Sequence, residues 1–202
     1  MGTKIIFIDT ETGGIDCKTT PLLQISGELE VEGRTVETFD FHLKPYPGQI
    51  ITDSAVAKTG LTEEIVSAYT DPNEVFIQFV AMLDKYVSKF DKQDKFQFVG
   101  YNSGFDVDFI RQFFLNNAKT EKDKEFGNGY GCYFWTPYID VMQMAAVDLF
   151  YKRVTLPNFK LATVWNYYLN STGQEIQWHD ASADIAATKD LFWLLMNKFK
   201  LS

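Results

Sequence analysis

Four carboxylates and one histidine occupy three short segments that lie far apart in the sequence. They are Asp9 and Glu11 near the N-terminus, Asp106 in the middle, and His179 and Asp184 near the C-terminus. Two like charges ~4 Å apart repel by roughly 4 kcal/mol at an effective dielectric near 20, and a divalent cation offsets such repulsion. A neighbouring histidine can accept a proton from water. A fold that joins the three segments would therefore be suited to metal-dependent hydrolysis.

The first pair of carboxylates ends a predicted strand. Residues 4–9 form a short apolar run, and Asp9 and Glu11 close it. Residues i and i+2 of a strand point to the same face, so both carboxylates face one side of the sheet. They also lie at its carboxyl end, where open α/β sheets bind ligands. Taken alone, the pair fits an acidic turn after an edge strand at least as well.

Asp106 opens a predicted helix directly after the apolar run at 96–100. A carboxylate in this place also stabilises a helix N-terminus. Asp108 is the competing candidate, but residues two apart lie about 200° apart around a helix, so both cannot face one site. Phe105 and Phe109 mark the buried face, and the Asn-x-x-Phe-Asp pattern at 102–106 selects Asp106.

The last two residues flank the start of a helix predicted over 180–199. Asp184 lies among alanines, which let a helix approach a sheet closely. A charge on such a face is unfavourable unless it is paired or bound to metal. His179 precedes the helix, where a histidine also fits a structural role. His42 lies in an alternating strand, and we interpret it as structural.

A glycine pair follows the first carboxylates. Glycine lets backbone N–H groups approach a ligand closely, so Gly13 and Gly14 are candidates for contact with a nucleotide. Ile15 is a candidate apolar wedge against a base, or an ordinary buried loop residue.

Apolar periodicity and turn residues predict the elements of an α/β chain. The 202 residues, of which 46% are apolar, suffice for one domain over 1–202, and no repeat or linker is visible. We expect strands at 4–9, 22–31, 35–43 and 96–100. We expect helices at 53–58, 72–90, 105–114, 139–151, 158–169 and 180–199, and a mobile surface loop over 116–135.

Charge and cysteine usage restrict the class of protein. The net charge of −8 argues against broad wrapping of a duplex, but not against holding one strand end in a small pocket. Cys17 and Cys132 form no CxxC pair, so a disulfide scaffold or a cysteine zinc site is not expected. Without a long apolar run or a signal peptide, we expect no membrane contact and a cytoplasmic location.

Three motifs together resemble the DEDDh, or DnaQ-like, family of 3′→5′ exonucleases. They are Asp-x-Glu-x-Gly at 9–13, Asn-x-x-Phe-Asp at 102–106 and His-x-x-x-x-Asp at 179–184. Residues 59–62 and 139–140 also resemble family segments, the latter a strand end in which Asp140 is structural. The family includes polymerase proofreading subunits, RNase T and oligoribonuclease. The resemblance covers nearly the whole chain and implies an RNase H-like fold, a mixed five-stranded sheet with helices on both faces.

The resemblance also implies a mechanism with two Mg²⁺ or Mn²⁺ ions that clamp the scissile phosphate. On this chain, Asp9 would bridge both ions, Glu11 and Asp184 would complete one site, and Asp106 would support the other. His179 would be the general base.

The resemblance further implies which residues contact the substrate. The candidates are Thr10, Glu11, Thr12, Gly13, Ile15, Asn102, Phe105 and His179. The implied activity releases nucleoside monophosphates from the 3′ end of single-stranded DNA. An RNA 3′-end exonuclease and a non-catalytic module or polymerase partner remain as alternatives. Many relatives have a histidine where this chain has Tyr101 and a basic residue where it has Asp180, whose charge would raise the pKa of a neighbouring base.

Overall fold

The protein is built on a single mixed sheet with the strand order β3-β2-β1-β4-β5. The structure, a computed structural model, describes residues 2–169 and 181–201. The strands are β1 (Lys4–Thr12), β2 (Leu22–Val31), β3 (Arg34–His42), β4 (Gln97–Gly100) and β5 (Ile139–Asp140). The first three pair antiparallel, whereas β4 runs parallel to both β1 and β5. The predicted five-stranded mixed sheet is confirmed.

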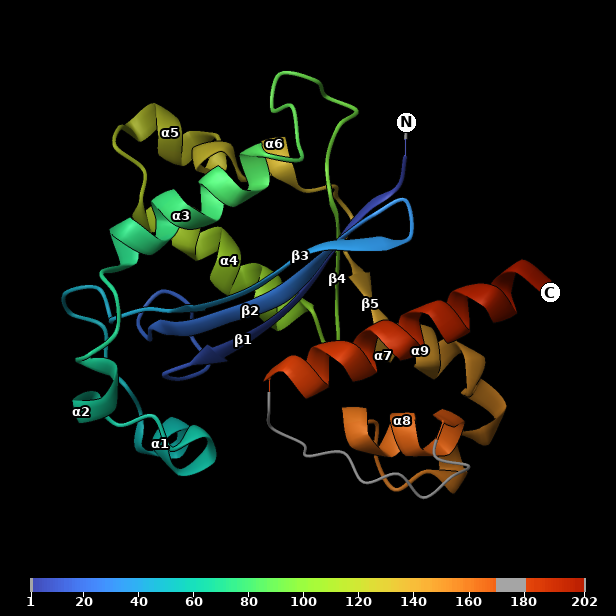
Figure 1. Cartoon of the computed structure of the whole chain (residues 1–202). Helices are drawn as coiled ribbons and strands as arrows, with labels where there is room; N and C mark the ends of the chain where they lie inside the picture. The colour runs from blue at the N-terminus through green and yellow to red at the C-terminus, as the bar shows by residue number, and fades with distance from the viewer. Residues whose placement is uncertain (1, 170–180, 202) are drawn as a thin grey trace.

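Helices cover both faces of this sheet, as expected. The α-helices are α1 (Asp53–Thr59), α2 (Glu63–Val66), α3 (Pro72–Asp84), α4 (Gly104–Asn116), α5 (Glu121–Glu125), α6 (Tyr130–Tyr133), α7 (Val141–Asp148), α8 (Leu161–Leu169) and α9 (Ala181–Leu201), with 3₁₀ helices η1 (Gly127–Gly129) and η2 (Phe150–Thr155). Figure 1 shows α3 and α4 on one side of the sheet and α7, α8 and α9 on the other. No helix among the described residues has both the length and the apolar character needed to cross a membrane.

Alternation along β1 divides its side chains between two cores. Ile6 and Ile8 pack with the aromatic residues of α3 and α4, whereas Ile5 and Phe7 pack with α7, α8 and α9. This is the period of two that a strand imposes. Asp9 and Glu11 continue the row of Ile5 and Phe7 beyond the apolar core, and so they lie on the α9 side of the sheet edge.

A tight hairpin joins β2 and β3, the strands predicted at 22–31 and 35–43. Its two connecting residues, Glu32 and Gly33, have φ angles of 52° and 76°. Two successive positive φ values are the mark of a type I′ turn, whose twist matches that of the flanking strands.

Helix α3 ends at Asp84, before the predicted limit at residue 90. The backbone N–H of Ser88 donates to the Asp94 carboxylate at 2.9 Å, and the Lys4 ammonium pairs with the same carboxylate. A polar cluster outside the helix thus binds a donor that a continuing helix would have used.

The segment 116–135 contains two short α-helices where a loop was predicted. Helix α5 begins with a capping box, because the Thr120 hydroxyl accepts the Asp123 backbone N–H at 3.1 Å and the Asp123 carboxylate accepts the Thr120 backbone N–H at 2.9 Å. Tyr130 and Tyr133 of α6 are buried and pack on Phe114. The Thr-x-x-Asp spacing is a sequence signal for such a helix start.

The helix predicted from residue 139 begins two residues later, as α7. Ile139 and Asp140 instead form β5 beside β4. The Asp140 carboxylate accepts the backbone N–H of Met142 at 2.9 Å and so caps α7. Asp140 therefore has a structural contact, as the resemblance implied.

Candidate active site

A cavity of about 310 Å³ lies at the carboxyl end of β1 and β4. Four of the five residues singled out in the sequence line it, and each of the three predicted segments contributes. The lining residues are Asp9, Thr10, Glu11, Gln24, Lys58, Thr59, Leu61, Tyr101, Asn102, Phe105, Asp106, Ala181 and Asp184. His179 and Asp180 lie outside the described residues.

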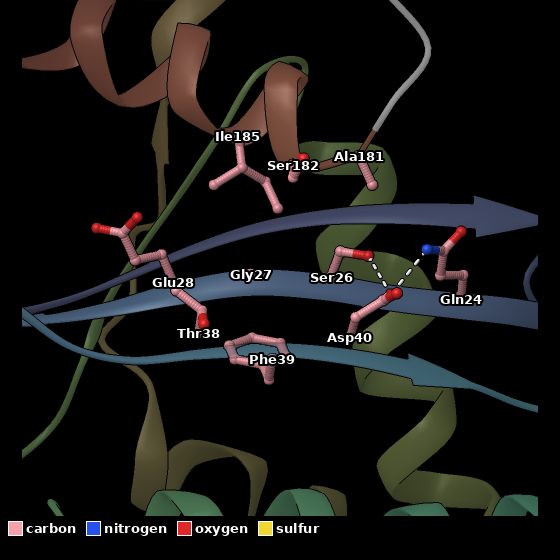
Figure 2. A pocket seen from close by; sticks show the side chains of 10 residues that line it. All are labelled: Gln24, Ser26, Gly27, Glu28, Thr38, Phe39, Asp40, Ala181, Ser182 and Ile185. Carbon is pink, nitrogen blue, oxygen red and sulfur yellow. Dashed lines mark hydrogen bonds between the residues drawn. The ribbon is translucent and has the colours of Figure 1, made fainter.

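A second cavity, of about 490 Å³, lies beside the first on β2 and β3, below the start of α9 (Figure 2). Its central carboxylate, Asp40, accepts hydrogen bonds from Gln24 and Ser26, both at 2.7 Å. His42 lies 3.0 Å from the other Asp40 oxygen. By volume alone this cavity would be preferred as the functional site, but its central carboxylate, Asp40, is already hydrogen-bonded to its neighbours. The clustered carboxylates lie in the smaller one.

Strand geometry positions the first two carboxylates. Asp9 is paired with Ser26 and Glu11 with Gln24 on the neighbouring β2. The register shifts directly after Glu11, where an irregularity interrupts the ladder. Both side chains thus lie where regular pairing ends, at the edge that faces the cavity.

The third carboxylate comes from the first turn of α4. Asp106 is buried, and its Oδ1 accepts the Thr10 backbone N–H at 3.0 Å and the Thr10 hydroxyl at 2.6 Å. These bonds fasten the start of α4 to the end of β1. Asp108 lies at the exposed surface, as the geometry of a helix predicts once Asp106 faces inward.

The fourth carboxylate comes from the first turn of α9. Downstream contacts hold this helix on β2. The Lys189 ammonium lies 3.3 Å from a carboxylate oxygen of the buried Glu30, and the Trp193 indole donates to Glu30 at 3.2 Å. Ala187 is buried against the sheet, where a small side chain permits close approach. Asp184 is thereby brought to the sheet edge.

The carboxylates influence one another electrostatically. The pKa of Asp9 is raised well above its usual value, first by burial and then by the charges of Asp106, Glu11 and Asp184, while Lys58 lowers it. Burial raises the pKa of Asp106 to about 7, although the hydrogen bonds from Thr10 oppose the change. The clustered carboxyls therefore hold protons more tightly than separate carboxyls do.

A divalent cation would relieve this repulsion, and carboxylate oxygen is the ligand that Mg²⁺ and Mn²⁺ prefer. The donor chemistry therefore fits such an ion. Within 2–169 and 181–201, however, no three Asp, Glu, His or Cys side chains already surround one point.

Three predicted substrate contacts are not among the described residues that line the cavity. The Gly13 N–H donates to the Pro21 carbonyl at 2.8 Å, and a Cβ at Gly13 would lie 2.6 Å from the Pro21 side chain. The Thr12 hydroxyl donates to Gly14 at 2.7 Å. Ile15 has an exposed fraction of 90%. Thr12 and Gly13 thus shape the loop, and Ile15 projects into solvent.

Other lining residues were missed as site residues in the sequence. Lys58 brings a cation to the carboxylates, and the neighbouring segment 59–62, which resembles the family, was the signal that could have identified it. Gln24 comes from the adjacent strand, which carried no such signal. Tyr101 lines the cavity while its hydroxyl donates to the Phe159 carbonyl at 2.7 Å.

The raised pKa values predict how the metal-free protein responds to pH. A carboxyl with a higher pKa in the folded chain binds more protons folded than unfolded, so the free energy of unfolding falls as pH rises between the two values. For Asp106 this window runs from about 3.9 when unfolded to about 7 when folded, and the loss amounts to roughly 4 kcal/mol. Denaturant unfolding in EDTA, measured across this pH window, should show a smaller fall in the free energy of unfolding for Asp106→Asn than for wild type.

Asp108→Asn on the same helix is the control and should follow the wild type.

At pH 8, Mg²⁺ at about 100 times its Kd should add roughly 2.7 kcal/mol to the free energy of unfolding. That gain should vanish when Asp9 and Asp184 are both replaced by asparagine. An equal gain in the double variant would mean that Mg²⁺ binds elsewhere.

The fold and the sequence both match known exonucleases. The family model of the RNase T exonucleases matches residues 6–192. The PolC-type DNA polymerase III of Pediococcus pentosaceus is 22% identical over 200 residues, which cover 96% of this chain but only 11% of the polymerase.

Solved structures show the same fold. E. coli exonuclease I in a zinc-bound complex with single-stranded DNA superposes with a TM-score of 0.70 at 21% identity, over 98% of this chain and 41% of that chain. Its complex with the oligonucleotide dT13 superposes with a TM-score of 0.69 at 22% identity, over 97% of this chain and 41% of that chain. The chain thus spans about two fifths of exonuclease I. Because the family model covers most of its length, the chain belongs to the RNase T exonuclease family, the DnaQ-like 3′→5′ exonucleases of the RNase H-like superfamily.

Proposed function

We propose that this chain, as one domain over 1–202, removes nucleoside monophosphates from the 3′ end of single-stranded DNA. The supporting observation is the cavity in which β1, α4 and α9 bring together Asp9, Glu11, Asp106 and Asp184. Its volume of about 310 Å³ is at the lower end of the range for small-ligand sites, which suits one terminal unit better than a duplex.

The four carboxylates would hold two Mg²⁺ or Mn²⁺ ions. When bound, such ions activate water and neutralise charge at a scissile phosphate. His179 would accept the proton of the attacking water. Lys58 lines the same cavity and would contact a phosphate oxygen. Among the described lining residues it is the one with a basic side chain. Asn102 and Phe105 would border the terminal nucleotide.

The preference for DNA is supported by what the matching proteins are. One is a DNA polymerase, and solved complexes of exonuclease I contain DNA oligonucleotides. We infer in addition that the chain works beside a polymerase or another replication or repair protein, because the polymerase carries its matching segment within a much longer chain. The rival substrate is RNA. Matched DNA and RNA oligonucleotides with the same 3′ end test the choice, and faster cleavage of RNA would contradict it.

Degradation should require a free 3′ end on a single strand and should fall only gently with added salt. The cavity suits one terminal nucleotide, and a chain of net charge −8 neutralises few phosphates. Log affinity falls by roughly 0.7 per phosphate contact for each unit of log salt on single strands. A labelled linear oligonucleotide, its circular form and a blunt duplex should be followed over a salt series.

The linear strand should shorten from its 3′ end, and the circle should persist. Rapid cutting of the circle would instead identify an endonuclease. A steep dependence on salt would indicate a long basic track, contrary to a short contact at the strand end.

A further inference from the structure

An exposed aromatic and basic surface lies on η2, outside both cavities. It consists of Phe150, Tyr151, Lys152, Arg153 and Val154, here called the η2 surface. Tyr151 and Val154 have exposed fractions of 94% and 95%, and Phe150 of 68%. Both cations are exposed as well. Exposed apolar side chains that cluster in this way indicate a contact surface, whereas single ones are common on any protein.

The sequence that forms and follows this surface carries the opposite charge to the whole chain. Residues 149–174 contain no Asp or Glu, but they contain Lys152, Arg153 and Lys160, in a chain of net charge −8. The nearest preceding acid, Asp148, is already paired with Lys198 and accepts a hydrogen bond from Tyr168. The η2 surface is therefore locally positive and suited to a polyanion.

Ring contacts order part of this surface. The rings of Phe150 and Tyr151 lie 5.1 Å apart at 88°, so they meet edge to face. The Arg153 guanidinium lies 4.9 Å from the centre of the Phe159 ring. Exposed aromatic rings beside cations are the features with which proteins hold single strands without regard to sequence.

The surface is connected to the active-site cavity through Phe159. Its ring carries Arg153, and its carbonyl accepts the Tyr101 hydroxyl at 2.7 Å. Tyr101 in turn lines the cavity with the carboxylates. One continuous line of contacts thus leads from the cavity wall to the η2 surface.

We propose that the η2 surface binds the single strand upstream of the nucleotide held in the cavity, with bases stacking on Tyr151 and phosphates meeting Lys152 and Arg153. This inference rests on the proposed function. A strand is favoured over a protein or lipid partner because the cations adjoin the exposed rings and because the substrate proposed for the cavity is itself a single strand. Such a contact would let a short basic surface retain the substrate between successive cleavages.

The test compares two double variants on a long and a small substrate. Tyr151→Ala/Arg153→Ala removes the proposed stacking ring and one cation. Phe90→Ala/Lys92→Ala is the matched control, because it removes an aromatic side chain with a 90% exposed fraction and an exposed cation from the connection between α3 and β4. The substrates are a labelled dT15 strand and the 4-nitrophenyl ester of thymidine 5′-phosphate, which has no upstream strand.

The first variant should raise KM for dT15 by roughly 5- to 150-fold, the loss expected for one stacked base. Its salt slope should fall by roughly 0.7. Hydrolysis of the small ester and all properties of the control should stay unchanged. Fluorescence anisotropy of labelled dT15 in EDTA should show the same loss of affinity, and this readout does not depend on hydrolysis.

Wild-type dT15 affinity in the first variant would overturn the inference. Equal losses on both substrates would also overturn it, because they would mean that Arg153 acts through Phe159 and Tyr101 on the cavity. Reduced binding of the variant to anionic vesicles, with unchanged binding of dT15, would assign the surface to lipid instead. A wild-type protein that binds dT15 through the η2 surface without cleaving either substrate would contradict the proposed function alone.

Discussion

Replacing Asp9 with asparagine is expected to abolish exonuclease activity while the fold is retained. Asp9 lies on the edge of β1, where the charges of Glu11, Asp106 and Asp184 all raise its pKa. The charges of the other three carboxylates therefore all act on Asp9, and it is the one proposed to contact both metal ions. Nucleotide release from a labelled single strand should fall below detection with Mg²⁺ or Mn²⁺.

The same variant should be more stable than the wild type when metal is removed. Asparagine has nearly the shape of aspartate but no charge, so it relieves repulsion within the cluster. Each kcal/mol relieved should raise Tm by about 2–4 °C in a chain of this size. Asp108→Asn is the matched control, since Asp108 is exposed two residues after Asp106. Cleavage by Asp9→Asn at a rate near that of the wild type would mean that the site is assigned wrongly.

The sheet was predictable because its strands impose a strong pattern. Apolar residues alternate along β2 and β3, and β1 is a short run buried on both faces. The two-residue strand β5 was not visible to periodicity, since Ile139 and Asp140 are too few to show a period. Their place follows from pairing with β4 and from the cap that Asp140 makes on α7. Only the family resemblance indicated that strand end.

The limits of two helical regions depended on contacts distant in sequence. The residues after Asp84 keep helical spacing, but Asp94 accepts the Ser88 backbone N–H and Lys4 donates to the Tyr86 carbonyl. In 116–135 the charged composition suggested a loop, whereas buried Tyr130 and Tyr133 fix the segment to the aromatic core. Burial of this kind depends on the partner helix and is not encoded in local composition.

The acidic part of the site was predictable because each carboxylate ends or begins a regular element. Strand parity placed Asp9 with Glu11, and helix geometry separated Asp106 from Asp108. Lys58 adjoins the family-like segment 59–62, which could have identified it. Gln24 reaches the cavity from a strand without a chemical motif, so only the folded arrangement shows it. The expected roles of Gly13 and Ile15 came from local sequence alone. In the structure Gly13 packs closely against Pro21, and the Ile15 side chain is exposed to solvent.

Replacing His179 with alanine is expected to lower kcat by roughly 10²- to 10⁴-fold, the usual contribution of a general base. The carboxylates remain, so the rise in Tm caused by Mg²⁺ should be unchanged. Hydroxide can replace the missing base, and the residual rate should therefore increase with pH across the range where the wild-type rate is flat. Single-turnover cleavage of a labelled strand, measured from pH 6 to pH 9, gives the loss of rate and its dependence on pH.

Asp180→Asn serves as the companion variant, because it changes the charge beside the base without removing the base. A neighbouring carboxylate raises the pKa of a histidine, since it stabilises the protonated ring. The Asp180→Asn profile should therefore reach its plateau at lower pH than the wild type, with a similar maximal rate. An unchanged rate for His179→Ala at neutral pH would remove His179 from the mechanism and leave proton transfer to solvent.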